Sequence, residues 1–395
     1  MIGFDEAVRL VASAAKPLGS EPVALDTATG RVLASPVVAR IDSPRCDVSG
    51  MDGYAVREPD LATLPVRLKV VGESFAGGGF DCTLGAGECV RIFTGAPVPA
   101  GAGRVVIQEI VRREGDAAIF DTAPGEEHFI RLAGGDFRFG EVLLEAGRFL
   151  DARAMLAAAA ADVAQLEVAK RPRVQILGTG DELVEPGSAA TAPGAVPDSV
   201  SFGIAALVGD WGGRAIGRQR LGDNLAELER AAADAVRDCD LVVVTGGASV
   251  GERDFAKAMF EPLGLELLFS NVAIKPGKPA WFGRAAGTPI IGLPGNPTSA
   301  LVTARLLLAP LLAGMTGRNT AEAFNWRSAP LARALGGCGA RETFHRARWR
   351  GGSVEILSNP DSSAQKMLAE ADVLVRQRAN TAALPAGEAV ELLDF

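Results

Sequence analysis

The sequence predicts a multidomain α/β protein, in which a doubly wound α/β domain is joined to a β-domain, a discontinuous helical domain and a C-terminal β-barrel. Its 395 residues exceed what one compact core holds, since a domain takes about 100–200 residues. Residues 171–318 alternate short apolar strands with helices, which predicts a parallel sheet covered on both faces. Residues 45–139 and 325–395 carry short apolar runs separated by glycine and proline, which predicts sheets without long helices.

Two helical segments flank the predicted β-domain. Residues 4–18 place apolar side chains at helical spacing and end at a proline and a glycine. Residues 151–165 are rich in alanine, the strongest helix former. Because one segment precedes the β-domain and the other follows it, residues 1–44 and 140–170 are predicted to pack together as the discontinuous domain.

The remaining elements follow from apolar periodicity. In the β-domain, strands are predicted at 66–71, 89–93 and 104–112. In the α/β domain, strands are predicted at 174–177, 215–219, 241–245, 265–269 and 289–293, and helices at 201–210, 225–237 and 299–312. Asp223 is the predicted N-cap of the helix at 225–237. In the last domain, strands are predicted at 343–349, 354–358, 373–376 and 389–393.

Composition excludes several classes of protein. The net charge is −8, whereas a duplex nucleic-acid partner requires a positive surface. No apolar run approaches the ~20 residues that span a bilayer, and the first residues lack the pattern of a secretory signal. Five cysteines without a CxxC pair predict reduced thiols, and two histidines exclude a histidine-rich zinc site. The sequence therefore predicts a cytoplasmic protein that binds neither nucleic acid nor a membrane.

Three glycine-rich turns follow predicted strands of the α/β domain directly, at 178–182, 245–251 and 293–299. Parallel topology brings such strand ends to one edge of the sheet, where backbone N–H groups bind phosphate or another oxyanion. A single turn of this kind can be explained by the geometry of a tight strand-to-helix connection without any ligand. Three such turns together favour a binding site. The predicted binding residues are Gly178, Thr179, Gly180, Gly246, Gly247, Pro294, Gly295, Asn296 and Pro297.

Lys275 and Lys278 lie in a turn that contains two prolines, in a chain with only seven lysines against 33 arginines. Proline restricts the conformations of the turn, and two like charges repel unless an anion lies between them. The alternatives are a solvated surface turn and a pocket for a compact dianion, and we favour the pocket.

Four acidic residues accompany these features. Asp52 lies in a loop that enters the β-domain, Asp136 follows two glycines, Glu182 ends the first glycine turn and Asp254 follows the second. Carboxylates beside an anion site favour a divalent cation such as Mg²⁺. Any one of them could instead cap a helix, most of all Asp254, which precedes a predicted helix at 255–260. No Ser-His-Asp set is recognisable in the sequence.

Six motifs occur in order along nearly the whole chain. They are MDGYAV at 51–56, RIFTGAPVP at 91–99, GTGDEL at 178–183, TGGASVG at 245–251, IKPGKP at 274–279 and LPGNP at 293–297. Together they resemble the molybdopterin molybdenumtransferase family, which includes the bacterial MoeA proteins and the E domain of gephyrin. The resemblance implies the last step of molybdenum cofactor assembly: molybdate is inserted into adenylylated molybdopterin, AMP is released and Mg²⁺ assists. It also implies that the α/β domain binds molybdopterin.

The resemblance assigns residues position by position. It places catalytic residues at Asp52, Thr94, Asp136, Glu182 and Asp254, and a further family carboxylate at Asp223. It places the molybdate site at Ser249, Lys275, Lys278, Arg346 and Ser363, and the ligands of the divalent cation at Asp52 and Glu182. It implies an elongated homodimer, with the active cleft between the α/β domain of one subunit and the β-domain of the other. The implied partners are a molybdopterin adenylyltransferase and acceptor molybdoenzymes.

The chain departs from the family pattern at four positions. Val200 and Asp372 stand where asparagine is common, Gly50 replaces an alanine and Phe255 replaces a tyrosine. The missing amide at Val200 motivates a second hypothesis, a non-catalytic molybdopterin-binding carrier or scaffold. A third hypothesis is molybdopterin adenylyltransferase activity, although the extra β-domains and the Asp52 loop would have no role in that enzyme.

Overall fold

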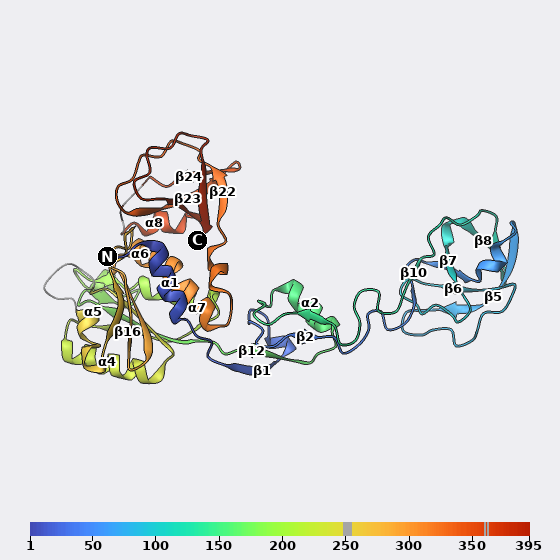
Figure 1. The fold of residues 1–395 in the computed structure, drawn as a ribbon, viewed down its shortest axis with the longest axis horizontal. Coiled ribbons are helices and arrows are strands. Elements are labelled where there is room, and N and C mark those ends of the chain that lie inside the picture. The colour runs from blue at the N-terminus through green and yellow to red at the C-terminus, as the bar shows by residue number, and fades with distance from the viewer. Residues whose placement is uncertain (248–254, 359–360, 362) are drawn as a thin grey trace.

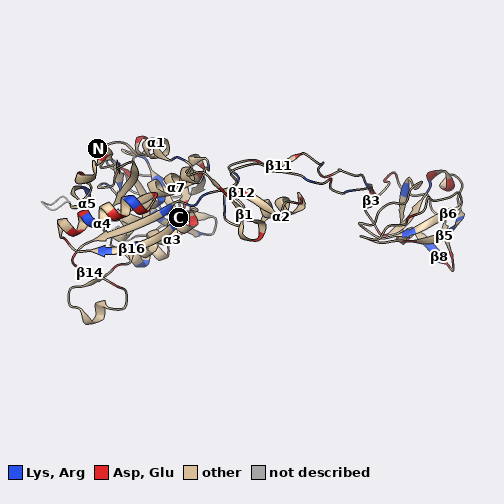
Figure 2. Cartoon of the chain, turned by 90° about the horizontal axis from the view of Figure 1, so that it is seen from below, with Lys and Arg blue, Asp and Glu red and all other residues tan. Residues whose placement is uncertain are grey.

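The structure, a computed structural model, describes residues 1–247, 255–358, 361 and 363–395. The molecule is elongated (Figure 1): the α/β domain and the C-terminal domain form one end, the β-domain forms the other, and a slender middle part joins them. Two extended stretches of chain connect the middle part to the β-domain (Figure 2). The predicted multidomain α/β architecture is confirmed.

The β-domain is a single six-stranded sheet. Its elements are β4 (Gly53–Val56), η2 (Glu58–Leu61), β5 (Val66–Ser74), β6 (Glu88–Ile92), β7 (Arg104–Ile107), η3 (Gln108–Ile110), β8 (Val111–Glu114) and β9 (Ala117–Phe120). The strand order is β7-β4-β6-β5-β9-β8. β4 begins where the antiparallel β6 ends, so Gly53 pairs with Ile92. Asp52 and Thr94 lie just outside this pair and are hydrogen-bonded to each other.

The middle part is built from segments on both sides of the β-domain. Its elements are β1 (Ser20–Ala24), η1 (Leu25–Thr27), β2 (Val37–Val38), β11 (Val142–Leu144), α2 (Ala152–Ala160) and β12 (Gln165–Ala169), and the short pair β3 (Val48–Ser49) and β10 (Ile130–Arg131) leads into the β-domain. β1 pairs antiparallel with β12, and β2 with β11. The N-cap of α2 is Asp151, whose carboxylate accepts a hydrogen bond from the Ala154 N–H at 2.9 Å.

The helix α1 (Phe4–Ala14) lies outside this middle part, so the predicted packing of the two flanking helices against each other is wrong. Its buried residues join the core of the α/β domain, and the Phe4 ring packs edge-on against Phe344, with centroids 5.0 Å apart. The buried residues of α2 are two alanines, Ala154 and Ala158, which offer a second helix little apolar area. The α/β core instead offers leucines of its long C-terminal helix.

The α/β domain contains one mixed sheet. Its strands are β13 (Arg173–Thr179), β16 (Arg214–Leu221), β17 (Leu241–Thr245), β18 (Glu266–Ser270), β20 (Trp281–Ala285) and β21 (Thr288–Leu293), with the small pair β14 (Leu183–Val184) and β15 (Val196–Pro197). Its helices are α3 (Val200–Asp210), α4 (Leu225–Asp238), α5 (Phe255–Ala258), α6 (Pro297–Thr303) and α7 (Ala309–Met315), with the shorter turns η4 (Ala189–Thr191), η5 (Glu261–Leu263) and η6 (Ala304–Leu308). The strand order is β16-β13-β17-β21-β20-β18, and the first four strands are parallel. The unpredicted β20 runs antiparallel to β18 and β21, so the sheet is mixed at one edge.

The start of α4 corrects a second prediction. Its N-cap is Asn224, whose side-chain oxygen accepts a hydrogen bond from the Glu227 N–H at 3.3 Å, and not Asp223. Asp223 instead donates its backbone N–H to Asp181 Oδ1 at 2.9 Å. Gly222 permits this contact, because an added carbon there would lie 2.9 Å from the same oxygen.

The helical stretch Pro297–Met315 is long and apolar enough to cross a bilayer. It is 94% buried inside the protein, so it serves as the core helix of the α/β domain.

The C-terminal domain is a small barrel. Its elements are η7 (Thr320–Phe324), β22 (Arg327–Pro330), β23 (Glu342–Arg350), β24 (Ser353–Ile356), α8 (Gln365–Ala369), β25 (Val373–Gln377) and β26 (Ala389–Asp394). The sheet follows the order β23-β25-β26-β22, β24 pairs with β23, and a bridge between Leu331 and Val354 joins the end of β22 back to β24. One further strand, β19 (Ile274–Lys275), comes from the α/β domain and pairs with β23, which places Lys275 opposite Thr343.

Candidate functional site

Two neighbouring cavities lie where the α/β domain meets the barrel. The first, of about 520 Å³, contains Lys275, Lys278 and Arg341 among its lining residues, and we call it the cationic cavity. The second, of about 610 Å³, is lined by the glycine turns, and we call it the turn cavity. Pro279 lines both. Successive residues at the start of α6 divide between them, since Pro297 lines the turn cavity and Thr298 the cationic cavity.

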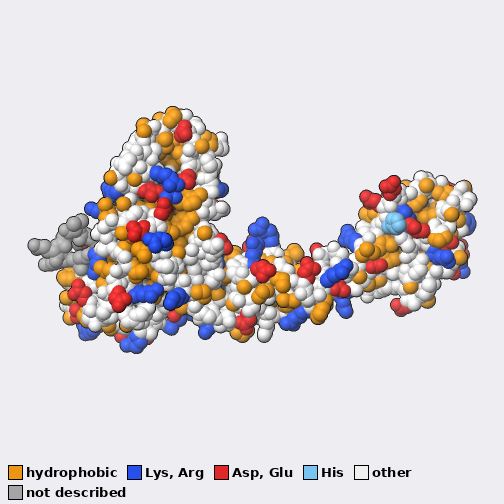
Figure 3. Space-filling model, viewed as in Figure 1, with side chains coloured by type: hydrophobic (Ala, Val, Ile, Leu, Met, Phe, Trp, Pro, Cys, Tyr) orange, Lys and Arg blue, Asp and Glu red, His pale blue; other side chains and the backbone are white. Residues whose placement is uncertain are grey.

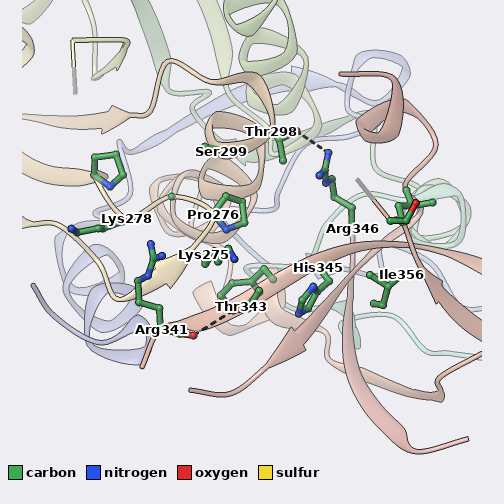
Figure 4. Close-up of a pocket in the computed structure, with 15 residues that line it drawn as sticks. Lys275, Pro276, Lys278, Thr298, Ser299, Arg341, Thr343, His345, Arg346 and Ile356 are labelled. Atoms are coloured by element: carbon green, nitrogen blue, oxygen red, sulfur yellow. Dashed lines mark hydrogen bonds between the residues drawn. The ribbon is translucent and has the colours of Figure 1, made fainter. Parts of the chain in front are cut away.

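The cationic cavity forms where β19 is added to the barrel. Across Figure 4 the cationic side chains follow the order Lys278, Arg341, Lys275 and Arg346, so positive charge extends along the whole cavity. The turn between the lysines needs glycine, because Gly277 has φ 108° and an added carbon would lie 2.2 Å from Thr303 Oγ1. A cavity with this charge suits a compact anion.

Arg346 is 7% exposed and reaches this cavity from β23. It donates to Thr298 Oγ1 at 3.0 Å, to the Ala364 carbonyl at 3.1 Å and to the Asp361 carbonyl at 3.3 Å. Through these bonds Arg346 links the segment before α8 to the start of α6. Burial lowers the pKa of its guanidinium. Arg346 therefore contributes both charge and shape to the cavity.

The predicted molybdate-binding residues do not all lie in the cationic cavity. Lys275 and Lys278 line the cationic cavity with Arg346. Ser363 lines the turn cavity instead, and its backbone N–H donates to Asp361 Oδ1 at 2.9 Å, which helps to lower the pKa of that carboxyl. Ser249 lies outside the described residues, as does Asp254.

Sequence reasoning missed two ionisable side chains of the cationic cavity, Arg341 and His345. Thr343 and His345 occupy alternate positions of β23, which places them on one face of the strand, and Arg341 immediately precedes this strand at the same spacing. The alternation is visible in the sequence, but it does not show that these positions face a cavity, because the cavity forms only where β19 pairs with β23.

His345 is held in one tautomer. Gln377 donates its Nε2 to the Gly336 carbonyl at 2.7 Å, so its Oε1 faces His345 Nε2 at 2.9 Å, and that nitrogen carries the proton. Burial and the nearby Lys275 lower the pKa of His345 below its usual value, although the bond to Gln377 opposes this. The ring is therefore neutral near pH 7 and gains charge when the pH falls.

We expect this protonation to strengthen anion binding. As the pH falls through the lowered pKa of His345, the cavity gains one positive charge, so its affinity for molybdate, supplied at micromolar concentration, rises. The expected rise is about tenfold for each unit by which the bound anion raises that pKa. Calorimetric titration between pH 7.5 and 5.5 measures this. His345→Gln should remove most of the pH dependence, and an unchanged dependence in that variant would contradict the assignment.

The turn cavity brings the three glycine turns together. Of the predicted binding residues, Gly178 and Gly180 are not part of its lining, which includes Thr179, Gly246, Gly247, Pro294, Gly295, Asn296 and Pro297. An added carbon at Gly246 would lie 2.4 Å from the Thr179 carbonyl oxygen, so the first two turns are in direct contact. Glu182 is exposed at the same rim, and its carboxylate lies against Gly180.

The wall of the turn cavity includes Asp198 and Val200 at the start of α3. Asp198 is 3% exposed and accepts hydrogen bonds from the Ser201 N–H at 3.1 Å and hydroxyl at 2.6 Å. Its carboxylate therefore holds the helix start, and the side chain of Val200 adds an apolar patch at the cavity.

Asp52 and Thr94 lie at the other end of the molecule, in the β-domain (Figure 1). Asp52 Oδ1 accepts both the Thr94 N–H and the Thr94 hydroxyl, each at 2.7 Å. These two bonds lower the pKa of Asp52, and Arg91 adds a smaller effect in the same direction. Asp52 Oδ2 accepts no hydrogen bond within the described chain, so one oxygen remains for a ligand.

A single chain does not gather those predicted acidic residues that the structure describes. Asp136 is exposed next to the middle part, where its backbone N–H donates to the Ser43 carbonyl at 2.9 Å, and Glu182 lies at the turn cavity. Within the described ranges no three Asp, Glu, His or Cys residues form a group that could hold a metal. Basic and acidic side chains are interspersed over the face seen in Figure 3.

Comparisons with known families cover almost the whole chain. Residues 2–161 match the MoeA N-terminal region (domain I and II), residues 175–314 match a probable molybdopterin binding domain, and residues 328–395 match the MoeA C-terminal region (domain IV).

Individual relatives agree with these matches. The chain is 37% identical over 341 residues to the molybdopterin molybdenumtransferase of Haemophilus influenzae, covering 86% of this chain and 82% of the relative. It is 35% identical over 413 aligned positions to the molybdopterin molybdenumtransferase 2 of Mycobacterium tuberculosis, covering 100% of both. A solved structure of the molybdopterin biosynthesis MoeA protein from Pyrococcus horikoshii has a TM-score of 0.86 at 27% identity, and 100% of each chain is covered.

Proposed function

Since the chain belongs to the molybdopterin molybdenumtransferase family, we propose that it inserts molybdate into adenylylated molybdopterin and releases AMP, assisted by a divalent cation such as Mg²⁺. The observation that carries the proposal is the junction of the two cavities at Pro279. An oxyanion bound in the cationic cavity would therefore lie next to a ligand bound by the glycine turns.

The two cavities suit the two substrates differently. Molybdate is a tetrahedral dianion, and the cationic cavity offers ammonium and guanidinium groups with the hydroxyls of Thr298 and Ser299. The turn cavity is larger and offers backbone N–H groups for the phosphates, with Val200 as an apolar contact for a ring. Binding both substrates side by side brings the metal oxide to the dithiolene.

A homodimer would bring the separated residues together. Asp52 and Thr94 lie far from both cavities of their own chain, so the proposed site takes them from a second copy (Figure 1). Leu132, Phe139 and Leu156 expose 63%, 73% and 73% of their surface on or beside the middle part, which supports an interface there.

The donor set fits Mg²⁺. Asp52 has a lowered pKa and a carboxylate oxygen to which no described residue donates a hydrogen bond, and Glu182 presents an exposed carboxylate at the turn cavity. Mg²⁺ binds one or two carboxylates together with phosphate oxygens. We propose that Asp52 of one subunit and Glu182 of the other hold the ion, which would polarise the phosphoanhydride.

Release of AMP tests the proposed function. We expect purified protein with Mg²⁺ to release AMP from adenylylated molybdopterin much faster when molybdate is present. The alternative, favoured by Val200, is a carrier that binds molybdopterin without reaction. Binding without any AMP release at saturating molybdate would support the carrier and contradict the transferase.

We also propose a cytoplasmic location. A molybdopterin adenylyltransferase would supply the substrate, and molybdoenzymes would accept the product.

A further inference from the structure

The Asp52–Thr94 pair depends on a third residue, Arg91. Arg91 lies on β6, directly opposite Tyr54 of β4 in the antiparallel register. This places its guanidinium beside the backbone that carries Asp52 and beside the turn that carries Thr94.

Arg91 contacts the backbone on the Asp52 side. Its NH1 donates to the Gly53 carbonyl at 3.0 Å, and its NH2 donates to the side-chain oxygen of Gln108. The Gln108 backbone N–H in turn donates to the Asp52 carbonyl at 3.1 Å. The Arg91 guanidinium is therefore linked by hydrogen bonds to the carbonyl groups of two successive residues. The link to Gly53 is direct, and the link to Asp52 runs through Gln108.

Arg91 also contacts the Thr94 side. Its guanidinium carbon lies 4.9 Å from the centre of the Phe93 ring and 5.1 Å from the centre of the Tyr54 ring. Phe93 immediately precedes Thr94, and its ring is stacked on Phe75 at 4.7 Å with an interplanar angle of 11°. The stack fixes the residue before Thr94, whose N–H and hydroxyl hold the Asp52 carboxylate.

We infer that Arg91 is the positioning residue for Asp52: its planar guanidinium links the β4 backbone to the Phe93–Thr94 turn and so sets the direction of the Asp52 carboxylate. A lysine could supply the charge, but it lacks the planar fork of donors that bonds both Gly53 and Gln108 beside the aromatic rings. The inference rests on the proposed role of Asp52 in the reaction.

The test compares Arg91→Met and Arg91→Lys with the wild type. We expect Arg91→Met to shift the backbone amide NMR signal of Thr94, whose N–H donates to Asp52 Oδ1, because the carboxylate changes direction. We expect kcat to fall about tenfold or more with little change in KM, because misplacement of a reacting group affects the reaction step. Arg91→Lys keeps the charge but not the two hydrogen bonds, so it should also shift the Thr94 signal and leave kcat reduced.

Arg67→Met is the matched control. Arg67 is an exposed arginine of β5 that pairs with Glu114, so its loss removes the same charge from the same sheet. Wild-type kcat in folded Arg91→Met, or a loss no larger than in Arg67→Met, would overturn the inference. If Arg91→Met fails to fold, Gln108→Leu removes one acceptor of Arg91. Wild-type kcat in both Gln108→Leu and Arg91→Lys would then overturn it.

The NMR measurement separates this inference from the proposed function, because it needs no turnover. A wild-type chain that never releases AMP would contradict the proposed function. A Thr94 amide signal that shifts in Arg91→Met and not in Arg67→Met would still support the positioning role.

Discussion

Asp52→Ala is expected to leave the protein folded and to lower molybdate-dependent AMP release by at least about a hundredfold, the size of effect typical for losing one electrostatic contact in a transition state. The carboxylate is partly exposed, and its hydrogen bonds are made to Thr94, outside the hydrophobic core. Its removal therefore affects the reaction more than the fold. The measurement is the rate of AMP release, with circular dichroism to establish folding.

Asp121→Asn is the control for this experiment. Asp121 is an exposed carboxylate of the same domain that pairs with Arg112. We expect wild-type rates from it. Full activity of Asp52→Ala would remove Asp52 from the mechanism.

The double variant Lys275→Met, Lys278→Met is expected to weaken molybdate binding about a hundredfold, roughly tenfold for each charge. Both lysines are exposed at the rim of the cationic cavity, so solvent screens them, and the wild-type affinity should fall as salt is added. Equilibrium dialysis with molybdate measures the loss. Lys69→Met, at an exposed position of the β-domain, is the matched control.

Unchanged molybdate affinity in the double variant would refute the anion site.

A separate experiment tests whether the proposed cleft is shared between two subunits. Mixed dimers of Asp52→Ala chains and lysine-variant chains contain one intact cleft of two, so random mixing should restore about a quarter of the wild-type activity. No recovery in dimers of established composition would contradict a cleft built from two subunits.

Features set by local sequence could be predicted well. The predicted strands of the α/β domain are short apolar runs that alternate with helical segments, which is typical of a buried parallel sheet, and the glycine turns follow those strands directly. β20 was missed because two of its five residues are Gly283 and Arg284, so it is not an apolar run, and its pairing with β18 and β21 is not visible in the sequence.

Features set by long-range packing could not be predicted. The partner of α1 depends on which core offers more apolar surface, and this is not encoded in the helix itself. Arg341 and His345 reach the cationic cavity only because β19 joins the barrel sheet beside β23. The roles of Asp52, Thr94 and the other predicted site residues stay predictions that the experiments above test.

The addition of β19 to the barrel has a consequence for anion selectivity. Lys275 and Thr343 are opposite each other in one hydrogen-bonded ladder, although they belong to different domains. The two walls of the cavity therefore cannot move apart without breaking that ladder, and the cavity is preorganised before an anion arrives. Discrimination among tetrahedral oxyanions then depends on their radius and charge, and closing of the protein around them contributes little.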